Sequence, residues 1–191
     1  MAGMTSDLVA RREEVMDRAD RALDKAWPDR KGQEYVSEME SAAKELEGIA
    51  VEMQVAGIEP VEQSRTYRYL GSVYSDLAPA LGKQLLMKSR DAYQKAETLL
   101  GVHGDVLEQA KLDFSFANTL RQLDPNDTKR LQEAERRFLA ARKVFAEKAP
   151  QNVARVDEAL SSTRNLLKLA PLANAVERNR AELGDLEGRL K

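Results

Sequence analysis

The side chains that most often carry catalysis are scarce in this chain. Its 191 residues include no cysteine and one histidine, His103, which lies between glycines in a stretch expected to be a loop. Disulfides, thiolate metal sites and sites built on several histidines are therefore excluded. Carboxylate pairs such as Glu13 and Glu14 fall on polar helix faces, where nothing marks a general acid or base. We expect a protein that is not an enzyme and that uses no metal and no cofactor.

Composition also argues against phosphate and nucleic-acid ligands. The glycines occur singly, so the chain has no glycine-rich phosphate loop. The formal net charge is -2, whereas proteins that bind nucleic acids are usually strongly basic. The basic residues between positions 129 and 143 are interleaved with Glu133 and Glu135. This pattern predicts a solvated, salt-bridged helix face, with a phosphate-binding patch as the alternative.

No stretch of the chain approaches the ~20 apolar residues that span a bilayer, and the start carries no secretory signal. Hydrophobic residues make up 42% of the chain and charged residues 32%, which is typical of a folded domain rather than a disordered segment. We therefore expect a cytoplasmic protein with no membrane partner and no nucleic-acid partner.

Six prolines and ten glycines punctuate the whole chain, which favours long helices over many short strands. Asp105 and Asp127 are expected to cap two of these helices. Pro171 stands where a proline would open the last helix. The predicted fold class is all-α, with about eight helices in four antiparallel pairs. They are expected at about residues 5–27, 33–55, 61–77, 83–100, 105–123, 128–148, 152–169 and from 171 onward.

One two-helix pattern occurs twice between residues 66 and 145. From Leu70 to Phe116 the step is 46 residues, and from Tyr93 to Phe138 it is 45. A fixed period of this size, built from two helical segments, is typical of a stacked helical array.

The first copy resembles the tetratricopeptide repeat, in which small residues let two helices approach and large ones fill the holes between pairs. The matching residues of the first copy are Tyr67, Leu70, Gly71, Tyr74, Ser89, Tyr93 and Ala96. The second copy matches less fully, with Phe116, Ala117, Leu120, Ala134, Phe138 and Ala141. The period is longer than the usual 34 residues of this family. Gly101 and Ala146 replace the proline that usually closes each repeat, and a third copy keeps only Leu166 and Leu169.

The resemblance implies a short right-handed α-solenoid in a single helical-repeat domain of residues 1–191. Its parts would be an N-terminal helical pair at 5–60, repeats at 61–104 and 105–150, and a degenerate repeat with capping helices at 151–191.

The resemblance also implies a concave groove, lined by the first helix of each pair. Projected onto this chain, the groove positions hold Arg65, Arg68, Ser72, Lys111, Phe114, Asn118, Arg121, Arg164 and Lys168. Such cations and amides could hold an acidic or C-terminal peptide through charge-assisted hydrogen bonds. The alternatives are ordinary solvated residues and, for Phe114, a place in the core. Ser115 and Ser161 occupy two positions where chaperone-binding members carry other residues, so that activity is not expected.

Two further features offer interaction surfaces. The last helix carries an apolar strip with one polar position, formed by Val176, Asn179, Leu183, Leu186 and Leu190 after Leu172. Its spacing resembles a short coiled coil, which predicts a homodimer or docking to another domain; the alternative is a capping helix whose strip faces the helix at 152–169. Trp27 is expected to be a core residue, with an exposed anchor for a partner as the alternative.

Together these patterns predict a non-enzymatic scaffold that binds a protein or peptide, an acidic one being a candidate, in a concave groove. The alternative is a regulatory or oligomerising arm of a larger protein that packs against its own neighbouring domain. A helical bundle with a ligand cavity is disfavoured, because the inward positions are almost wholly apolar or small.

Overall fold

The computed structural model describes the backbone of residues 2–25, 32–101 and 104–189, and the side chains of 5–24, 32–101 and 104–182. Within these ranges the chain forms seven α-helices, one short 3-10 helix and no strand. The α-helices are α1 (Ala2–Lys25), α2 (Gln33–Val55), α3 (Pro60–Leu81), α4 (Gln84–Leu100), α5 (Val106–Leu123), α6 (Thr128–Lys148) and α7 (Val153–Arg189). The 3-10 helix is η2 (Pro150–Asn152). The all-α prediction is confirmed, whereas Trp27 and His103 lie outside the described residues.

Local signals explain several helix ends. The Asp127 carboxylate accepts hydrogen bonds from the backbone N–H groups of Lys129 and Arg130, and Asp105 accepts one from Leu107. These caps satisfy donors that have no partner inside the first turn of a helix. The bounds of α2 and α6 coincide with those predicted from sequence.

Two helices continue through prolines beyond their expected ends. α3 was expected to end at about residue 77 but continues through Pro79 to Leu81, and the expected break at Pro171 is absent because α7 runs unbroken from Val153 to Arg189. The described residues thus form seven α-helices rather than eight. A proline removes one backbone hydrogen bond and bends a helix without necessarily ending it. Both prolines are solvent-exposed, so water can satisfy the carbonyl that loses its partner.

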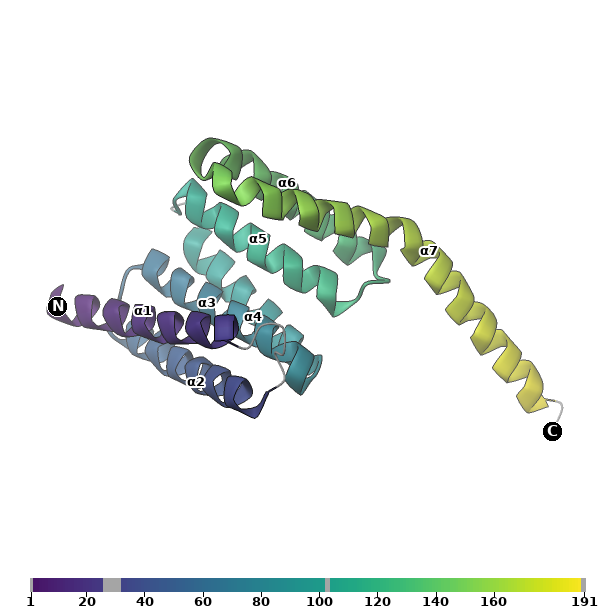
Figure 1. Cartoon of the computed structure of the whole chain (residues 1–191), viewed down its shortest axis with the longest axis horizontal. Helices are drawn as coiled ribbons and strands as arrows, with labels where there is room; N and C mark the ends of the chain where they lie inside the picture. The colour runs from purple at the N-terminus through teal and green to yellow at the C-terminus, as the bar shows by residue number, and fades with distance from the viewer. Residues whose placement is uncertain (1, 26–31, 102–103, 190–191) are drawn as a thin grey trace.

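The helices pack mainly on their neighbours in the chain. The pairs α1–α2, α3–α4 and α5–α6 are in contact, and α2–α3, α4–α5 and α6–α7 join one pair to the next. In addition, α1, α3, α5 and α7 contact one another in that order (Figure 1). The projecting second half of α7 extends away from this body (Figure 1).

Buried apolar side chains form two clusters, one mainly between α1, α2 and α3 and the other mainly between α4, α5, α6 and α7. Tyr67 and Leu85, from the α3–α4 pair, pack against both clusters. α6 buries five residues spaced by three and four positions, among them the repeat positions Ala134, Phe138 and Ala141; the other two are Leu131 and Phe145. The α3–α4 pair therefore connects the two parts of the core.

Gly71 permits the close approach of α3 and α4. A Cβ atom at this position would lie 2.7 Å from Cε1 of Tyr93, which is too close for any side chain. The hydroxyl of Ser89 donates a hydrogen bond of 2.7 Å to the Gly71 carbonyl. Two small residues at the crossing thus let a buried tyrosine lie directly against a helix backbone.

We expect Gly71→Ala to lower the free energy of unfolding by about 1–3 kcal/mol, because the added methyl group overpacks the contact with Tyr93. The matched control is Gly48→Ala on the exposed face of α2, where an added Cβ meets nothing within 4 Å. That change should raise stability by up to about 1 kcal/mol, because alanine favours a helix. Urea unfolding of both variants measures the difference, and equal stabilities would contradict the proposed contact.

Candidate functional site

A pocket of about 640 Å³ lies where α3, α5 and α7 meet. We call it the α3–α5–α7 pocket. Among the groove residues predicted from sequence, it brings together Ser72, Phe114, Asn118 and Arg121. Its other lining residues are Ser75, Asp76, Tyr93, Ser115, Gln122, Arg155, Glu158, Ala159 and Ser162. The pocket is therefore mainly polar, with hydroxyl, amide and charged groups of both signs.

Three of the lining residues stand on one face of α5. Phe114, Asn118 and Arg121 are spaced by four and three positions, which places them side by side along a helix. The opposite face of α5 is held in the core by Leu112, Phe116 and similar residues. The burial of that face turns the Phe114–Arg121 face toward the pocket.

Phe114 belongs to both the core and the pocket. It is partly buried, and its ring lies edge-on to Phe138 and Phe145 at centroid distances of 5.7 and 6.4 Å. On the pocket side, the Arg155 guanidinium lies 5.4 Å from the ring centroid. Phe114 thus forms a rigid apolar wall on which a cation is held.

Arg121 is a partly buried cation without an ion pair among the described residues. Its Nη2 donates a hydrogen bond of 3.3 Å to Oδ1 of Asn118, whose Nδ2 donates to the Phe114 carbonyl at 3.1 Å. Burial lowers the pKa of Arg121, and the charge of Glu158 opposes this effect only in part. Arg65 shows the opposite balance: burial acts to lower its pKa, but Glu108 and Glu62 raise it overall. Arg121 therefore retains a charge that its surroundings do not neutralise.

The floor of the pocket carries several hydroxyl groups. The hydroxyl groups of Tyr93 and Ser72 are 3.0 Å apart, and burial raises the pKa of Tyr93 to about 12. The hydroxyl of Ser75 accepts a hydrogen bond of 3.4 Å from Thr119. At neutral pH these groups act as neutral donors and acceptors.

Arg65, Arg68 and Lys111 come together as well, but around a carboxylate of their own chain. Glu108, whose side chain is 8% exposed, lies 2.8 Å from Lys111 Nζ and 3.4 and 3.7 Å from nitrogens of Arg65 and Arg68. Burial acts to raise the pKa of Glu108, but the three cations lower it overall. The Nε atom of Arg68 and the Oε2 atom of Glu108 are buried without a hydrogen bond. These three groove candidates thus face a carboxylate of their own chain, which they share.

Arg12 extends this charge network to α1. Its side chain is 2% exposed, and Nη1 donates to Oε2 of Glu62 at 2.8 Å and to the Glu62 carbonyl at 3.1 Å. Glu62 also pairs with Arg65 at 2.6 Å. The sequence interpretation missed Arg12, although its position between Leu8 and Val15 places it on the apolar stripe of the helix.

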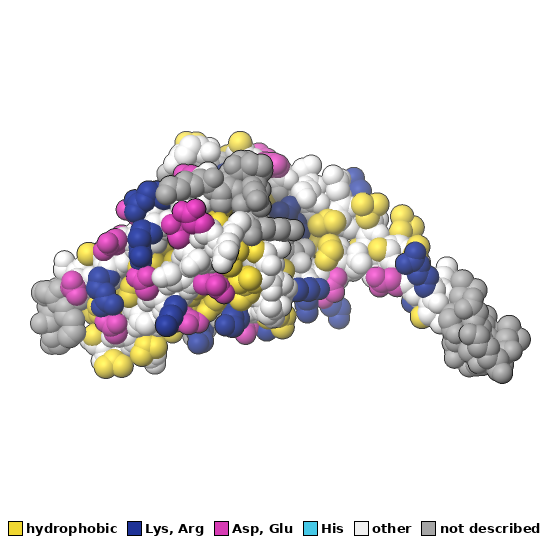
Figure 2. All heavy atoms as spheres, turned by 60° about the horizontal axis from the view of Figure 1, so that its bottom comes forward, with side chains coloured by type: hydrophobic (Ala, Val, Ile, Leu, Met, Phe, Trp, Pro, Cys, Tyr) yellow, Lys and Arg dark blue, Asp and Glu magenta, His cyan; other side chains and the backbone are white. Residues whose placement is uncertain are grey.

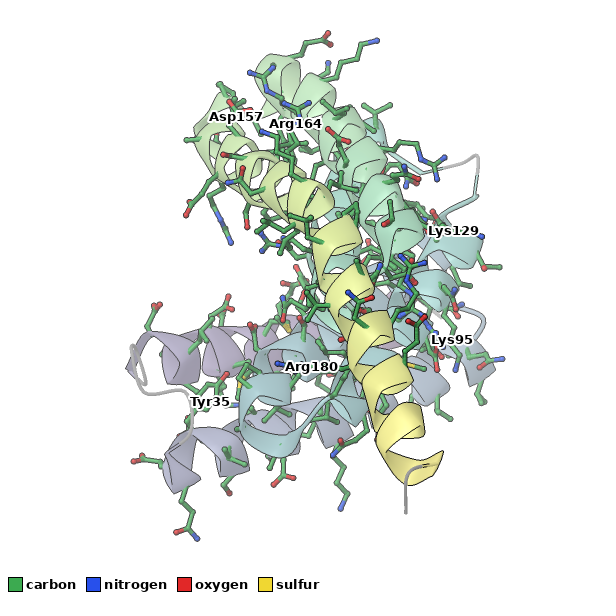
Figure 3. All side chains as sticks on the ribbon, turned by 90° about the vertical axis from the view of Figure 1, so that its right-hand side faces the viewer. Tyr35, Lys95, Lys129, Asp157, Arg164 and Arg180 are labelled. Carbon is green, nitrogen blue, oxygen red and sulfur yellow. The ribbon has the colours of Figure 1, made fainter. Side chains whose placement is uncertain are left out.

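Arg164 and Lys168 lie at a different place. They line a pocket of about 480 Å³ between α6 and α7, together with Arg142 and Asp157. Arg164 pairs with Glu135 at 2.6 Å, and Figure 3 shows Asp157 and Arg164 together on the first half of α7. The structure therefore does not bring Arg164 and Lys168 to the pocket that contains Arg121.

The basic face of α6 is salt-bridged. Arg137 pairs with Glu97, Asp113 and Glu133 at 2.8, 2.9 and 3.1 Å, and it lies over the ring of Phe116. Arg130 and Arg142 also pair, with Asp127 and Asp157. Three of the six basic residues between positions 129 and 143 therefore lie in ion pairs, as the salt-bridged interpretation predicts.

The C-terminal strip was expected either to be exposed or to face the helix at 152–169. That second alternative is wrong, because the strip and residues 153–169 belong to the same continuous helix, α7. Val176 and Asn179 are exposed. The side chains of Leu183 and Leu186 and the whole of Leu190 lie outside the described residues.

Other site types find no support in the described part of the chain. It contains no cluster of three or more histidine, cysteine, aspartate or glutamate side chains placed to hold a metal ion. Among the helices described, none combines the length and apolar character that crossing a membrane requires.

Comparison with known proteins identifies no relative of this chain. No protein family matches the chain, and neither a curated protein nor a solved structure shows significant similarity to it.

We expect Glu108→Gln to lower the free energy of unfolding at neutral pH by about 2–4 kcal/mol, because it leaves the mostly buried Arg68 without a carboxylate and takes one from Arg65 and Lys111. The pKa of Glu108 is lowered in the folded state, so its contribution is present above the ordinary glutamate pKa of about 4.3 and is lost as the pH falls through the folded-state value. The difference in the free energy of unfolding between wild type and Glu108→Gln should therefore become smaller at acidic pH. Urea unfolding at several pH values measures it, with the exposed Glu38→Gln as control. A difference independent of pH would contradict this role.

We expect Arg12→Met to lower the free energy of unfolding by about 1–3 kcal/mol, because Glu62 loses one of its two cationic partners and its carbonyl loses a hydrogen-bond donor. Arg18→Met, which removes an exposed pair with Glu45, should change it by at most about 1 kcal/mol. Hydrogen exchange adds a local measurement: Arg12→Met should reduce protection in α1 more than in α6. Equal effects of the two substitutions would show that Arg12 does not hold α1 in place.

Proposed function

We propose that the chain is a non-enzymatic helical-repeat scaffold that binds an acidic segment of a protein partner in the α3–α5–α7 pocket. The proposed scaffold is a right-handed solenoid; the successive contacts of α1, α3, α5 and α7 support its stacking, in which the first helices of the pairs share one surface. The pocket lies on that shared surface.

The observation that carries this proposal is that Arg121 is partly buried and has no ion pair among the described residues. A half-buried guanidinium without a carboxylate partner is electrostatically unfavourable, and an anionic ligand relieves this by forming charge-assisted hydrogen bonds. The side chain is already positioned by Asn118, which is itself anchored on the α5 backbone. Little conformational freedom is then lost when a ligand binds.

The remaining walls favour a single carboxylate over a strongly anionic ligand. Asp76 and Glu158 also line the pocket and repel further negative charge. The hydroxyls of Ser72, Ser115 and Tyr93 offer neutral partners for a peptide backbone. An extended peptide with an isolated Asp or Glu side chain fits this combination of groups.

The test is a screen of random peptides on an array with wild-type protein, Arg121→Gln and Arg164→Gln. We expect wild type to select peptides with an aspartate or glutamate, and Arg121→Gln to bind them about 10- to 150-fold more weakly, the loss typical of a hydrogen bond to a charged group. Arg164→Gln is the matched control, because its arginine pairs with Glu135 outside the pocket. The proposal would be refuted if wild type selected peptides without an acidic residue, or if both variants lost the same amount of binding affinity.

A further inference from the structure

The two halves of α7 have different surroundings. The first half packs against α6 and buries Val156, Leu160 and Thr163. Beyond Pro171, the helix leaves the body and continues to Arg189 (Figure 1). Residues 171–189 extend roughly 28 Å at the usual rise of an α-helix. Figure 3 shows Arg180 on this projecting half.

The projecting half carries exposed apolar side chains in a regular order. Leu169, Leu172 and Val176 are 58%, 66% and 51% exposed. Figure 2 shows hydrophobic side chains along this arm. In the sequence the same alternation of three and four residues continues through Asn179, Leu183, Leu186 and Leu190. We call the six of these positions that lie within α7, from Leu169 to Leu186, the α7 strip.

The body of the protein lies on the opposite side of the helix from the strip. Asn174 Nδ2 donates a hydrogen bond of 3.1 Å to the Asn126 carbonyl, so the Asn174 face is turned toward the body. Asn174 follows Leu172 by two residues, which is about 200° around an α-helix. The described part of this chain therefore does not cover Leu172 and Val176, and this side of the helix is open to a second molecule.

The spacing of the strip is that of a seam between two helices. Apolar positions that alternate by three and four residues keep to one side when helices supercoil around each other. α6 carries this spacing from Leu131 to Phe145 and buries all five members against neighbouring helices. The strip offers the same kind of surface without a partner.

Asn179 points to the identity of that partner. In the middle of an apolar seam, its amide needs both a donor and an acceptor. An unrelated apolar groove would leave these groups unpaired, whereas a second copy aligned in parallel places the same amide opposite. We infer that two copies of this chain associate through the α7 strip as a short parallel coiled coil, with Asn179 facing its equivalent.

The flanking residues indicate how strongly the copies associate. Ala173 and Ala175 border the seam and are small enough to let two helices approach. Glu182 and Glu187 occupy bordering positions that face each other in a parallel pair and repel. The dimer should therefore be reversible, and it should tighten as salt screens this repulsion.

Sedimentation of the full chain over a range of concentrations tests the inference. Wild type should shift from monomer to dimer, and Leu172→Glu/Val176→Glu should remain monomeric with unchanged helix content by circular dichroism. The matched control is Val51→Glu/Val55→Glu, which places the same charges on two exposed valines of α2 and should still dimerise. A wild type that stays monomeric at every concentration, or a dimer that survives the α7 substitutions, would overturn the inference.

Cysteine cross-linking tests the parallel arrangement, because the chain contains no cysteine of its own. Facing positions of a two-stranded seam lie within the distance that a disulfide spans. Under mild oxidation, Asn179→Cys should form a covalent dimer, whereas Arg178→Cys, outside the strip, should not. A dimer that depends on the strip but does not cross-link at position 179 would overturn the parallel pairing.

Discussion

The close contact between α3 and α4 is the constraint on which the rest of the structure depends. Gly71 lets the ring of Tyr93 lie against the α3 backbone, and Ser89 adds a hydrogen bond at the same crossing. This pair joins the two apolar clusters, because Tyr67 and Leu85 pack against both. The same contact places the Tyr93 hydroxyl beside Ser72, on the floor of the α3–α5–α7 pocket. Core packing and the shape of the candidate site therefore share one origin.

The arginines of this protein serve two different purposes. Arg12, Arg65 and Arg137 pair with carboxylates from other helices, and these pairs orient neighbouring helices relative to one another. Burying a charge is unfavourable unless a partner compensates it, so each such arginine specifies the position of an acidic residue. Arg121 has no such partner among the described residues. A cation left in this state is better suited to an external ligand than to holding the fold together.

The two halves of α7 differ in the kind of side chain that they expose to solvent. Its first half packs on α6 and exposes polar side chains such as Ser161 and Asn165. Its second half exposes Leu172 and Val176 instead. One continuous helix therefore packs on the body along its first half and presents exposed apolar side chains along its second. The two proposed interactions, in the pocket and along the strip, use separate surfaces.

The sequence by itself determined the helical class, the bounds of α2 and α6, and Ala134, Phe138 and Ala141 as packing positions of α6. These features follow from helical periodicity and from caps such as Asp127, which depend on residues within a turn or two. Only the tertiary structure decided that α7 continues through Pro171, because a proline can bend a helix or end it. It also decided that Arg68 and Lys111 surround Glu108 while Arg121 remains unpaired. Such pairings depend on which faces of separate helices meet, and this is set by packing across the core rather than by spacing along the chain.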